Sequence, residues 1–286
     1  MVVSQKVLVL AGILALQLSG LSSGRAEEVS TAATQTPSIS IIAWNLEGRR
    51  SDADLMCRHL KSFSNDQIFA LSEVDPERFE MYRKALGENY QSAAAETGRD
   101  LRLQILFDGD RFELLSREEL ERYRDNVLND GRHRSPLLVR LRDRETGMVF
   151  QVMVNHLARG DAAFRTVQAA GLREWGRDQT LPTFCVGDFN FDFAFDTRRG
   201  NDAFPEMLRD NVWTWVEPVE LIDTNWADRN EDGIDDYPDS MLDFAFVAGP
   251  AKDWNLKCEV IVREGDFPAR REESDHRAIR LVATPK

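Results

Sequence analysis

The chain has 286 residues, with 36 Lys and Arg against 49 Asp and Glu, and a formal net charge of −13. Apolar residues make up 42% and charged residues 30%, proportions that exclude a disordered or fibrous chain. The acidic balance argues against a protein that holds nucleic acid mainly through a basic surface. It does not exclude an enzyme that holds one phosphate through metal ions.

The N-terminal segment predicts export. In residues 1–26, Lys6 precedes an apolar run over residues 7–18 and small, polar residues follow, as in a secretory signal peptide. The run is shorter than the ~20 residues of a spanning helix, so an uncleaved anchor is the weaker alternative and no stable membrane span is expected after processing. Residues 27–37 are predicted to be a linker and residues 38–286 one domain, in a secreted or periplasmic protein of bacterial type.

Strand-type and helix-type patterns alternate along that domain. In chain order we expect a strand over 38–44, a helix over 52–63, a strand over 68–71, a helix over 76–86, hairpins of 103–107 with 111–115 and of 136–141 with 148–154, a helix over 161–178, and strands over 183–186, 241–247, 256–262 and 278–283. This order predicts an α/β protein with mixed rather than purely parallel sheets. The cysteines Cys57, Cys185 and Cys258 are widely spaced, which leaves one disulfide or none.

Polar side chains recur where the apolar runs end. Taken singly, each is more often a turn former than a ligand. Asp243 differs, because a carboxylate inside the apolar run 241–247 must be paired once it is buried. Ligands and catalytic groups gather where strand ends converge in α/β sheets, and oxygen side chains suit a hard divalent cation.

Six short motifs carry a resemblance to a known family. In order, they are Trp44-Asn45-Leu46-Glu47, Ser72-Glu73-Val74-Asp75, Asn155-His156-Leu157, Gly187-Asp188-Phe189-Asn190, Leu242-Asp243-Phe244 and Ser274-Asp275-His276. This set resembles the endonuclease/exonuclease/phosphatase superfamily, which includes deoxyribonuclease, abasic-site endonucleases and sphingomyelinases. The resemblance implies a four-layer α/β/β/α sandwich with two packed mixed sheets and a divalent-metal-dependent phosphoester hydrolase.

The resemblance also implies roles for individual residues. Glu73 would be the principal ligand of Mg²⁺ or Mn²⁺, helped by Asn45 and Asp275. Asp188 would activate the attacking water, and Asn190 would hold a phosphate oxygen. His276, paired with Asp243, and His156 would place two imidazoles at the scissile phosphate. In-line attack on a phosphoester needs these functions.

Two further site residues have open interpretations. Glu47 is either an additional metal ligand or a solvent-facing residue at a loop start. Arg134 is either a phosphate contact or, more often for an arginine, a solvated surface residue.

An acidic segment predicts a structural calcium loop. Its spacing matches the EF-hand loop except that Asp replaces the final Glu, and the expected ligands are Asp228, Asn230, Asp232, Ile234 through its carbonyl, Asp236 and Asp239. The alternative is an acidic turn that leads into the strand of Asp243.

The substrate stays open between nucleic acid, a phospholipid and a small molecule. A nuclease or general phosphodiesterase is favoured, although no basic cluster with interleaved aromatics is evident. Trp213-Thr214-Trp215 is a candidate lipid-contacting hairpin, or simply core. A non-catalytic binding module and a calcium-stabilised adhesin are weaker alternatives. No protein partner is predicted.

Overall fold

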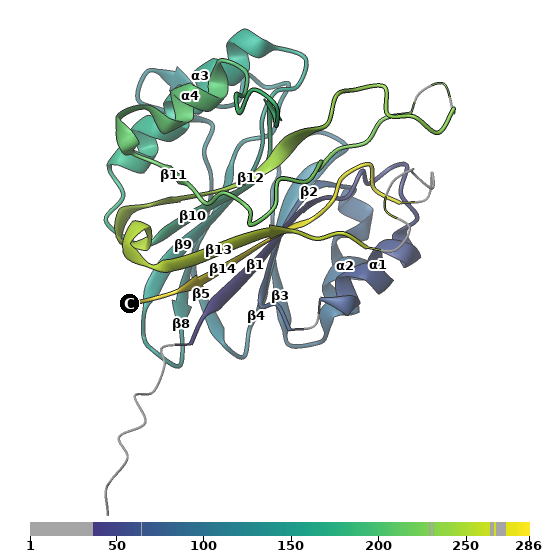
Figure 1. Cartoon of the computed structure of the whole chain (residues 1–286). Helices are drawn as coiled ribbons and strands as arrows, with labels where there is room; N and C mark the ends of the chain where they lie inside the picture. Colours follow the sequence, from purple (N-terminus) through teal and green to yellow (C-terminus); the bar gives the residue numbers. More distant parts are fainter. Residues whose placement is uncertain (1–36, 64, 229, 231, 264–265, 267–272) are drawn as a thin grey trace, which may run out of the picture. The chain divides into compact units, whose positions relative to one another are not determined.

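Two six-stranded sheets pack face to face in a computed structural model that describes residues 37–63, 65–228, 230, 232–263, 266 and 273–286. The first sheet has the order β13-β14-β1-β2-β4-β3 and the second the order β11-β12-β10-β9-β8-β5 (Figure 1). Each sheet contains parallel and antiparallel pairs. The predicted signal peptide, and residues 27–36 of the predicted linker, lie outside the described residues.

The strands of the first sheet are β1 (Ile39–Asn45), β2 (Ile68–Val74), β3 (Tyr90–Ala94), β4 (Arg102–Asp108), β13 (Asn255–Val260) and β14 (Ile279–Thr284). Those of the second are β5 (Phe112–Glu119), β8 (Leu137–Asp143), β9 (Val149–His156), β10 (Thr183–Ala194), β11 (Thr214–Trp215) and β12 (Ser240–Ala248). A small separate hairpin joins β6 (Arg122–Tyr123) to β7 (Asn126–Val127).

Helices cover the outer face of each sheet. On the first sheet, α1 (Ala53–Ser62) and α2 (Phe79–Leu86) pack in an apolar cluster with Trp44 and Phe69. On the second sheet lie α3 (Ala162–Arg177) and α4 (Ala203–Leu208). In the described part of the chain, none of the helices has the length and apolarity needed to cross a membrane.

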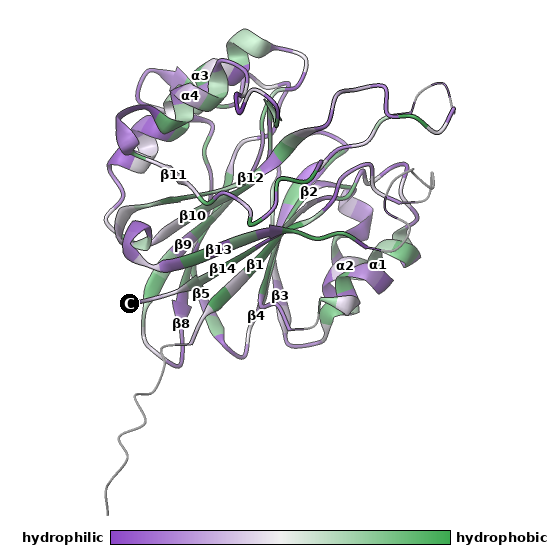
Figure 2. Ribbon diagram, viewed as in Figure 1, coloured by the Kyte–Doolittle hydropathy of each residue, from purple (hydrophilic) through white to green (hydrophobic). Residues whose placement is uncertain are grey.

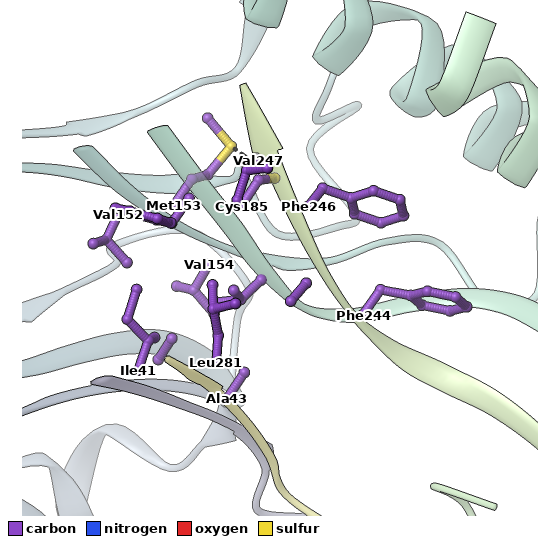
Figure 3. Close-up of a cluster of buried hydrophobic side chains, with 14 of the residues drawn as sticks. Ile41, Ala43, Val152, Met153, Val154, Cys185, Phe244, Phe246, Val247 and Leu281 are labelled. Atoms are coloured by element: carbon purple, nitrogen blue, oxygen red, sulfur yellow. Dashed lines mark hydrogen bonds between the residues drawn. The ribbon is translucent and has the colours of Figure 1, made fainter. Parts of the chain in front are cut away.

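The core between the sheets is built from alternating strand residues. Ile41, Ala43 and Leu281 of the first sheet face Val152 and Val154 of β9 (Figure 3). Hydrophobic colour follows the strands, while the outer helical faces and the loops are mainly hydrophilic (Figure 2). Burial of this apolar surface is the main stabilising contribution to the sandwich.

One predicted pairing is wrong. The strands expected to form a hairpin around Asp108-Gly109-Asp110 belong to different sheets, because β4 pairs with β2 and β3 whereas β5 pairs with β8. A local turn signal specifies that the chain changes direction, but it does not specify which strand edge receives the next segment. The predicted hairpin of β8 and β9 is present.

All three cysteines are free thiols, so the alternative without a disulfide holds.

Candidate active site

The site forms where strand ends of the two sheets meet. In the first sheet β1 runs parallel to β2, and Asn45 lies beside Ser72. In the second sheet β9 runs parallel to β10, and His156 lies beside Asp188. Asp243 of β12 lies on the other side of Asp188. The carboxyl ends of parallel strands are the usual ligand-binding edge of α/β sheets.

A β-bulge in β2 brings Glu73 into the site. The register of β2 against β4 shifts between Leu71 and Val74, and Glu73 has a φ of 53°, which residues other than glycine rarely adopt. The carbonyl of Glu73 accepts a hydrogen bond from the Gly48 N–H at 2.9 Å. A Cβ at Gly48 would lie 2.2 Å from that carbonyl oxygen, so only glycine permits this approach.

The middle of β10, where its register against β12 shifts between Asp188 and Phe193, is shaped in the same way. Gly187 has a φ of +124°, and a Cβ there would lie 2.3 Å from the carbonyl oxygen of Asn155. Asp188 Oδ1 accepts a hydrogen bond from the Asn190 backbone N–H at 3.0 Å. The Asn190 side chain donates to the Leu157 carbonyl at 3.0 Å. Asp188 and Asn190 are therefore held by backbone groups before any ligand binds.

Three of the predicted site residues lie around Asp188. Its Oδ2 accepts a hydrogen bond from Asn45 Nδ2 at 3.1 Å, lies 3.4 Å from His156 Nε2 and lies 3.8 Å from His276 Nε2. The other ring nitrogen of His156 lies 3.5 Å from Glu73 Oε1. Residues from both sheets thus surround one buried carboxylate.

His276 is paired with Asp243. His276 Nδ1 lies 2.8 Å from Asp243 Oδ2, and both side chains are buried. The backbone N–H of His276 donates to Ser274 Oγ at 3.0 Å, and that hydroxyl donates to the Asn45 carbonyl. Asp275 Oδ1 lies 3.8 Å from His276 Nε2.

The two imidazoles are pushed to opposite charge states. Burial lowers the pKa of His156 well below its usual value, and the Arg134 guanidinium lowers it further. Burial alone would also lower the pKa of His276, but the carboxylates of Asp243 and Asp275 raise it well above the usual value. At neutral pH one ring is therefore neutral and the other is an imidazolium.

Two acids have strongly raised pKa values. Burial, followed by the charge of Asp243, raises the pKa of Asp188 to about 7. Burial and the nearby Asp275 carboxylate raise the pKa of Glu47 to about 7. Glu47 is thus directed inward rather than toward solvent, and its Oε2 accepts a hydrogen bond from the Asp275 N–H at 3.3 Å.

The donor set fits a hard divalent cation. Glu47, Glu73 and Asp275 supply carboxylates and Asn45 an amide oxygen, the donor types that Mg²⁺ and Mn²⁺ prefer. The Glu47 and Asp275 carboxylates repel each other, and a bound cation would relieve this repulsion. Among the described residues, the carboxylates of Glu47, Glu73 and Asp275 do not all lie within 4.8 Å of one another. Such spacing is compatible with Mg²⁺, which usually keeps several waters and takes one or two carboxylates.

Arg134 faces the site rather than open solvent. Its Nη2 lies 3.5 Å from Glu73 Oε1, and its Nε donates to the Leu101 carbonyl at 2.8 Å. Its side chain is only 18% exposed. The interpretation of Arg134 as a solvated surface arginine is therefore wrong.

Arg159 is a site residue that the sequence reasoning missed. It donates to Asn190 Oδ1 at 3.2 Å and to Asn225 Oδ1 at 3.4 Å, and it lies 5.6 Å from the centre of the Tyr237 ring. Asn225 in turn donates to the Asp275 carbonyl at 3.2 Å. The available signal was position, because Arg159 follows His156 by three residues, in the loop after β9.

The acidic segment forms a turn held by its own carboxylates. Asp228 accepts hydrogen bonds from the N–H groups of Asp232 and Gly233, and Asp232 Oδ1 accepts one from Ile234 at 2.9 Å. Gly233, at the predicted glycine position, has a φ of +81°.

The carboxylates that come together in this region are a different set from the predicted ligands. Among the described residues, those of Asp223, Asp235 and Asp239 lie within 4.8 Å of one another. Asp239 alone belongs to both sets. The predicted ligands Asn230 and Asp236 are exposed.

Comparisons with known proteins agree with this fold. A model of the endonuclease/exonuclease/phosphatase family matches residues 42–276. A mannosyl-6-phosphatase structure from Bacteroides thetaiotaomicron is 17% identical, with 85% of this chain and 98% of that chain covered and a TM-score of 0.64. D. rerio TDP2 complexed with a single-strand DNA product is 17% identical, with coverages of 86% and 99% and a TM-score of 0.65. The human Nocturnin catalytic domain with bound sulfate is 15% identical, with coverages of 87% and 95% and a TM-score of 0.60.

The chain belongs to the endonuclease/exonuclease/phosphatase family. The sandwich of two mixed sheets with flanking helices is confirmed, as is the prediction of a hydrolase acting on phosphoric esters. Enzymes of this family generally use divalent metals such as Mg²⁺. A comparison with curated protein sequences gives no match.

Proposed function

We propose that this protein is a metal-dependent phosphodiesterase, with nucleic acid as the favoured substrate. One observation carries the proposal: Asp188 lies within 3.8 Å of two imidazoles in opposite charge states and is hydrogen-bonded to Asn45 from the other sheet. A carboxylate with a pKa of about 7 is suited to accept a proton near neutral pH.

Each predicted residue has a part in this proposal. Asp188 takes a proton from the attacking water, and Asn190 holds a non-bridging phosphate oxygen. The His276 imidazolium, fixed by Asp243, stabilises negative charge that develops on the phosphate. The neutral imidazole of His156, whose Nε2 lies 3.4 Å from Asp188 Oδ2, orients the scissile phosphate.

Glu73, Asn45 and Asp275 would hold the metal, with Glu47 as a fourth ligand. When bound, Mg²⁺ or Mn²⁺ neutralises charge on the phosphate and favours attack. Arg159 keeps Asn190 in place through its hydrogen bond to Oδ1.

The substrate alternatives differ in support. A small-molecule phosphatase is supported by the neighbour described as a mannosyl-6-phosphatase, and a nuclease by the neighbour bound to a single-strand DNA product. A lipid phosphodiesterase is less supported, because Trp213 is buried, stacks on Trp175 and so gives no exposed apolar hairpin. A non-catalytic module is disfavoured by the complete set of acids and imidazoles.

Hydrolysis assays test the proposal. Plasmid DNA, oligonucleotides, sphingomyelin, a sugar 6-phosphate and bis-p-nitrophenyl phosphate are incubated with the protein in Mg²⁺, Mn²⁺, Ca²⁺ or EDTA. Cleavage of the nucleic acid or the diester, abolished by EDTA and by Asp188→Ala, is expected. Activity that is unchanged in EDTA contradicts the mechanism.

Two further proposals rest on the sequence. Residues 1–26 are a cleaved signal peptide, which mass spectrometry of the protein secreted by an expressing bacterium tests. The acidic loop binds Ca²⁺ as a structural ion, supported by the grouping of Asp223, Asp235 and Asp239.

A further inference from the structure

A basic pocket lies next to the candidate active site. It has a volume of about 240 Å³ and is lined by Arg49, Gly98, Arg99, Asp100, Leu101, Arg132 and Arg134. The lining holds four arginines and one aspartate. It is therefore rich in basic side chains, although the whole chain has a net charge of −13. Such a concentration of one charge in a concavity attracts an anion.

Arg134 connects this pocket with the catalytic residues. Its guanidinium lies 3.5 Å from Glu73 Oε1, and the same carboxylate oxygen lies 3.5 Å from His156 Nδ1. One side chain therefore separates the pocket from the groups that surround the scissile phosphate. A ligand in the pocket would be close enough to belong to the same substrate molecule.

The loops that form the pocket are held in place. The Glu119 carboxylate accepts hydrogen bonds from the backbone N–H groups of Glu96 and Thr97 at 2.6 and 2.9 Å. Thr97 Oγ1 accepts one from the Ser135 N–H at 2.9 Å, which joins the loop before β4 to the loop before β8. A fixed loop backbone lowers the ordering cost of bringing the pocket arginines to a bound anion.

Gly98 permits the close packing of these loops. It has a φ of +102°, and a Cβ there would lie 2.7 Å from Arg134 Cγ and 2.7 Å from the Leu101 carbonyl oxygen. The backbone of Gly98 therefore sits directly against the arginine that joins the pocket to the site.

Among the described residues, three of the four pocket arginines have a carboxylate within 4.0 Å, and Arg99 does not. The Arg99 side chain is exposed. Arg49 pairs with Asp100 at 3.0 Å, and both side chains are more than half exposed. Arg132 pairs with Asp130, which does not line the pocket.

We propose that this pocket binds a second phosphate of the substrate, adjacent to the one that is hydrolysed. Arginine binds phosphate through paired, charge-assisted hydrogen bonds. Arg99 has no carboxylate partner among the described residues, and the salt-bridged Arg49 and Arg132 are more than half exposed, so these guanidinium groups can turn to a bound phosphate. The second phosphate can come from the next residue of a nucleic acid strand or from a small nucleotide with two phosphates. The inference rests on the proposed phosphodiesterase function and extends it to substrate choice.

Two chromogenic esters that differ by one phosphate test the proposal. Thymidine 5′-(p-nitrophenyl phosphate) is compared with the same compound carrying a 3′-phosphate. The wild-type protein is expected to show a kcat/KM about tenfold higher for the second ester. Arg99→Gln and Arg132→Gln should each reduce this ratio severalfold. Arg140→Gln, an exposed arginine on β8 with the same charge change, should retain it.

Oligothymidylates separate the two sources of the phosphate. If the pocket holds the next phosphate of a strand, their hydrolysis depends steeply on salt, and Arg99→Gln lowers the slope of log kcat/KM against log salt concentration by about one. An unchanged slope with a changed ester ratio assigns the pocket to a small nucleotide.

The proposal is overturned if wild-type protein hydrolyses both esters equally, or if Arg99→Gln and Arg140→Gln change the ratio alike. Failure to hydrolyse any phosphodiester contradicts the proposed function instead.

Discussion

Asn45 Nδ2 donates a hydrogen bond to Asp188 Oδ2 at 3.1 Å, although the two residues are 143 positions apart and belong to different sheets. This contact joins the end of β1 to the middle of β10. It places the residue proposed to bind the metal against the residue proposed to activate water, so the relative position of the two sheets sets the geometry of the site.

Replacement of Asp188 by Asn should separate catalysis from stability. The amide cannot accept the proton, and we expect kcat to fall by on the order of 10²–10⁴. The pKa of Asp188 is raised to about 7 in the folded protein. The folded protein therefore loses stability as the pH rises from the pKa of an unfolded aspartate to about 7, because the buried carboxyl group must give up its proton. In EDTA at pH 8 the melting temperature of Asp188→Asn should therefore equal or exceed that of wild type. A large drop would mean that the carboxylate is required for folding.

Asp243→Asn should shift the pH profile in one direction. Asp243 raises the pKa values of both His276 and Asp188. If activity needs protonated His276 and ionised Asp188, both limbs of the kcat/KM profile move to lower pH in the variant. Measurement from pH 4 to 10 checks this. Limbs that stay in place would show that other groups control the profile.

Arg159 should matter through Asn190. Arg159→Ala removes the hydrogen bond to Asn190 Oδ1, and we expect a loss of about tenfold in kcat/KM. Arg159→Lys should recover part of this loss. Arg122→Ala, an exposed arginine in β6, is the matched control and should have wild-type kinetics.

Gly98 and Gly147 form a matched pair for backbone strain. Both have positive φ, but a Cβ at Gly147 has no atom within 4 Å, whereas one at Gly98 meets Arg134. Gly147→Ala should destabilise the protein by about 1 kcal/mol. Gly98→Ala should cost about 1–3 kcal/mol and also lower activity, because Arg134 must move. Urea unfolding and kinetics measure both, and equal effects would contradict this packing.

Calcium binding should weaken as the pH falls. Burial, together with the nearby Asp235 and Asp239, raises the pKa of Asp223 to about 6, so protons compete with the cation below that pH. Calorimetry at pH 7.5 should show a Ca²⁺-binding event that diminishes at pH 5 and in Asp235→Ala. Asp253→Ala, away from the cluster, should retain it. A loss in Asp232→Ala alone would instead favour the EF-hand-like ligand set.

The ends of the apolar runs could be predicted to form the site because two sequence patterns coincide there. Apolar runs end in Asp, Glu, Asn or His at β1, β2, β9 and β10, and these polar residues lie at the site. The hairpin expected around Gly109 failed because a turn between two strands does not reveal that they enter different sheets. Short elements such as β3 and α4 were not predicted, since their patterns are too brief to stand out.

The six motifs, read in order, are enough to identify the family, because residue type and order along the chain do not depend on the relative position of the sheets. The charge states of His156 and His276, the inward orientation of Glu47, the contribution of Arg159 and the basic pocket around Gly98 depend on burial and on contacts between distant segments. Those properties exist only once the two sheets have packed together, since desolvation and neighbouring charges control them.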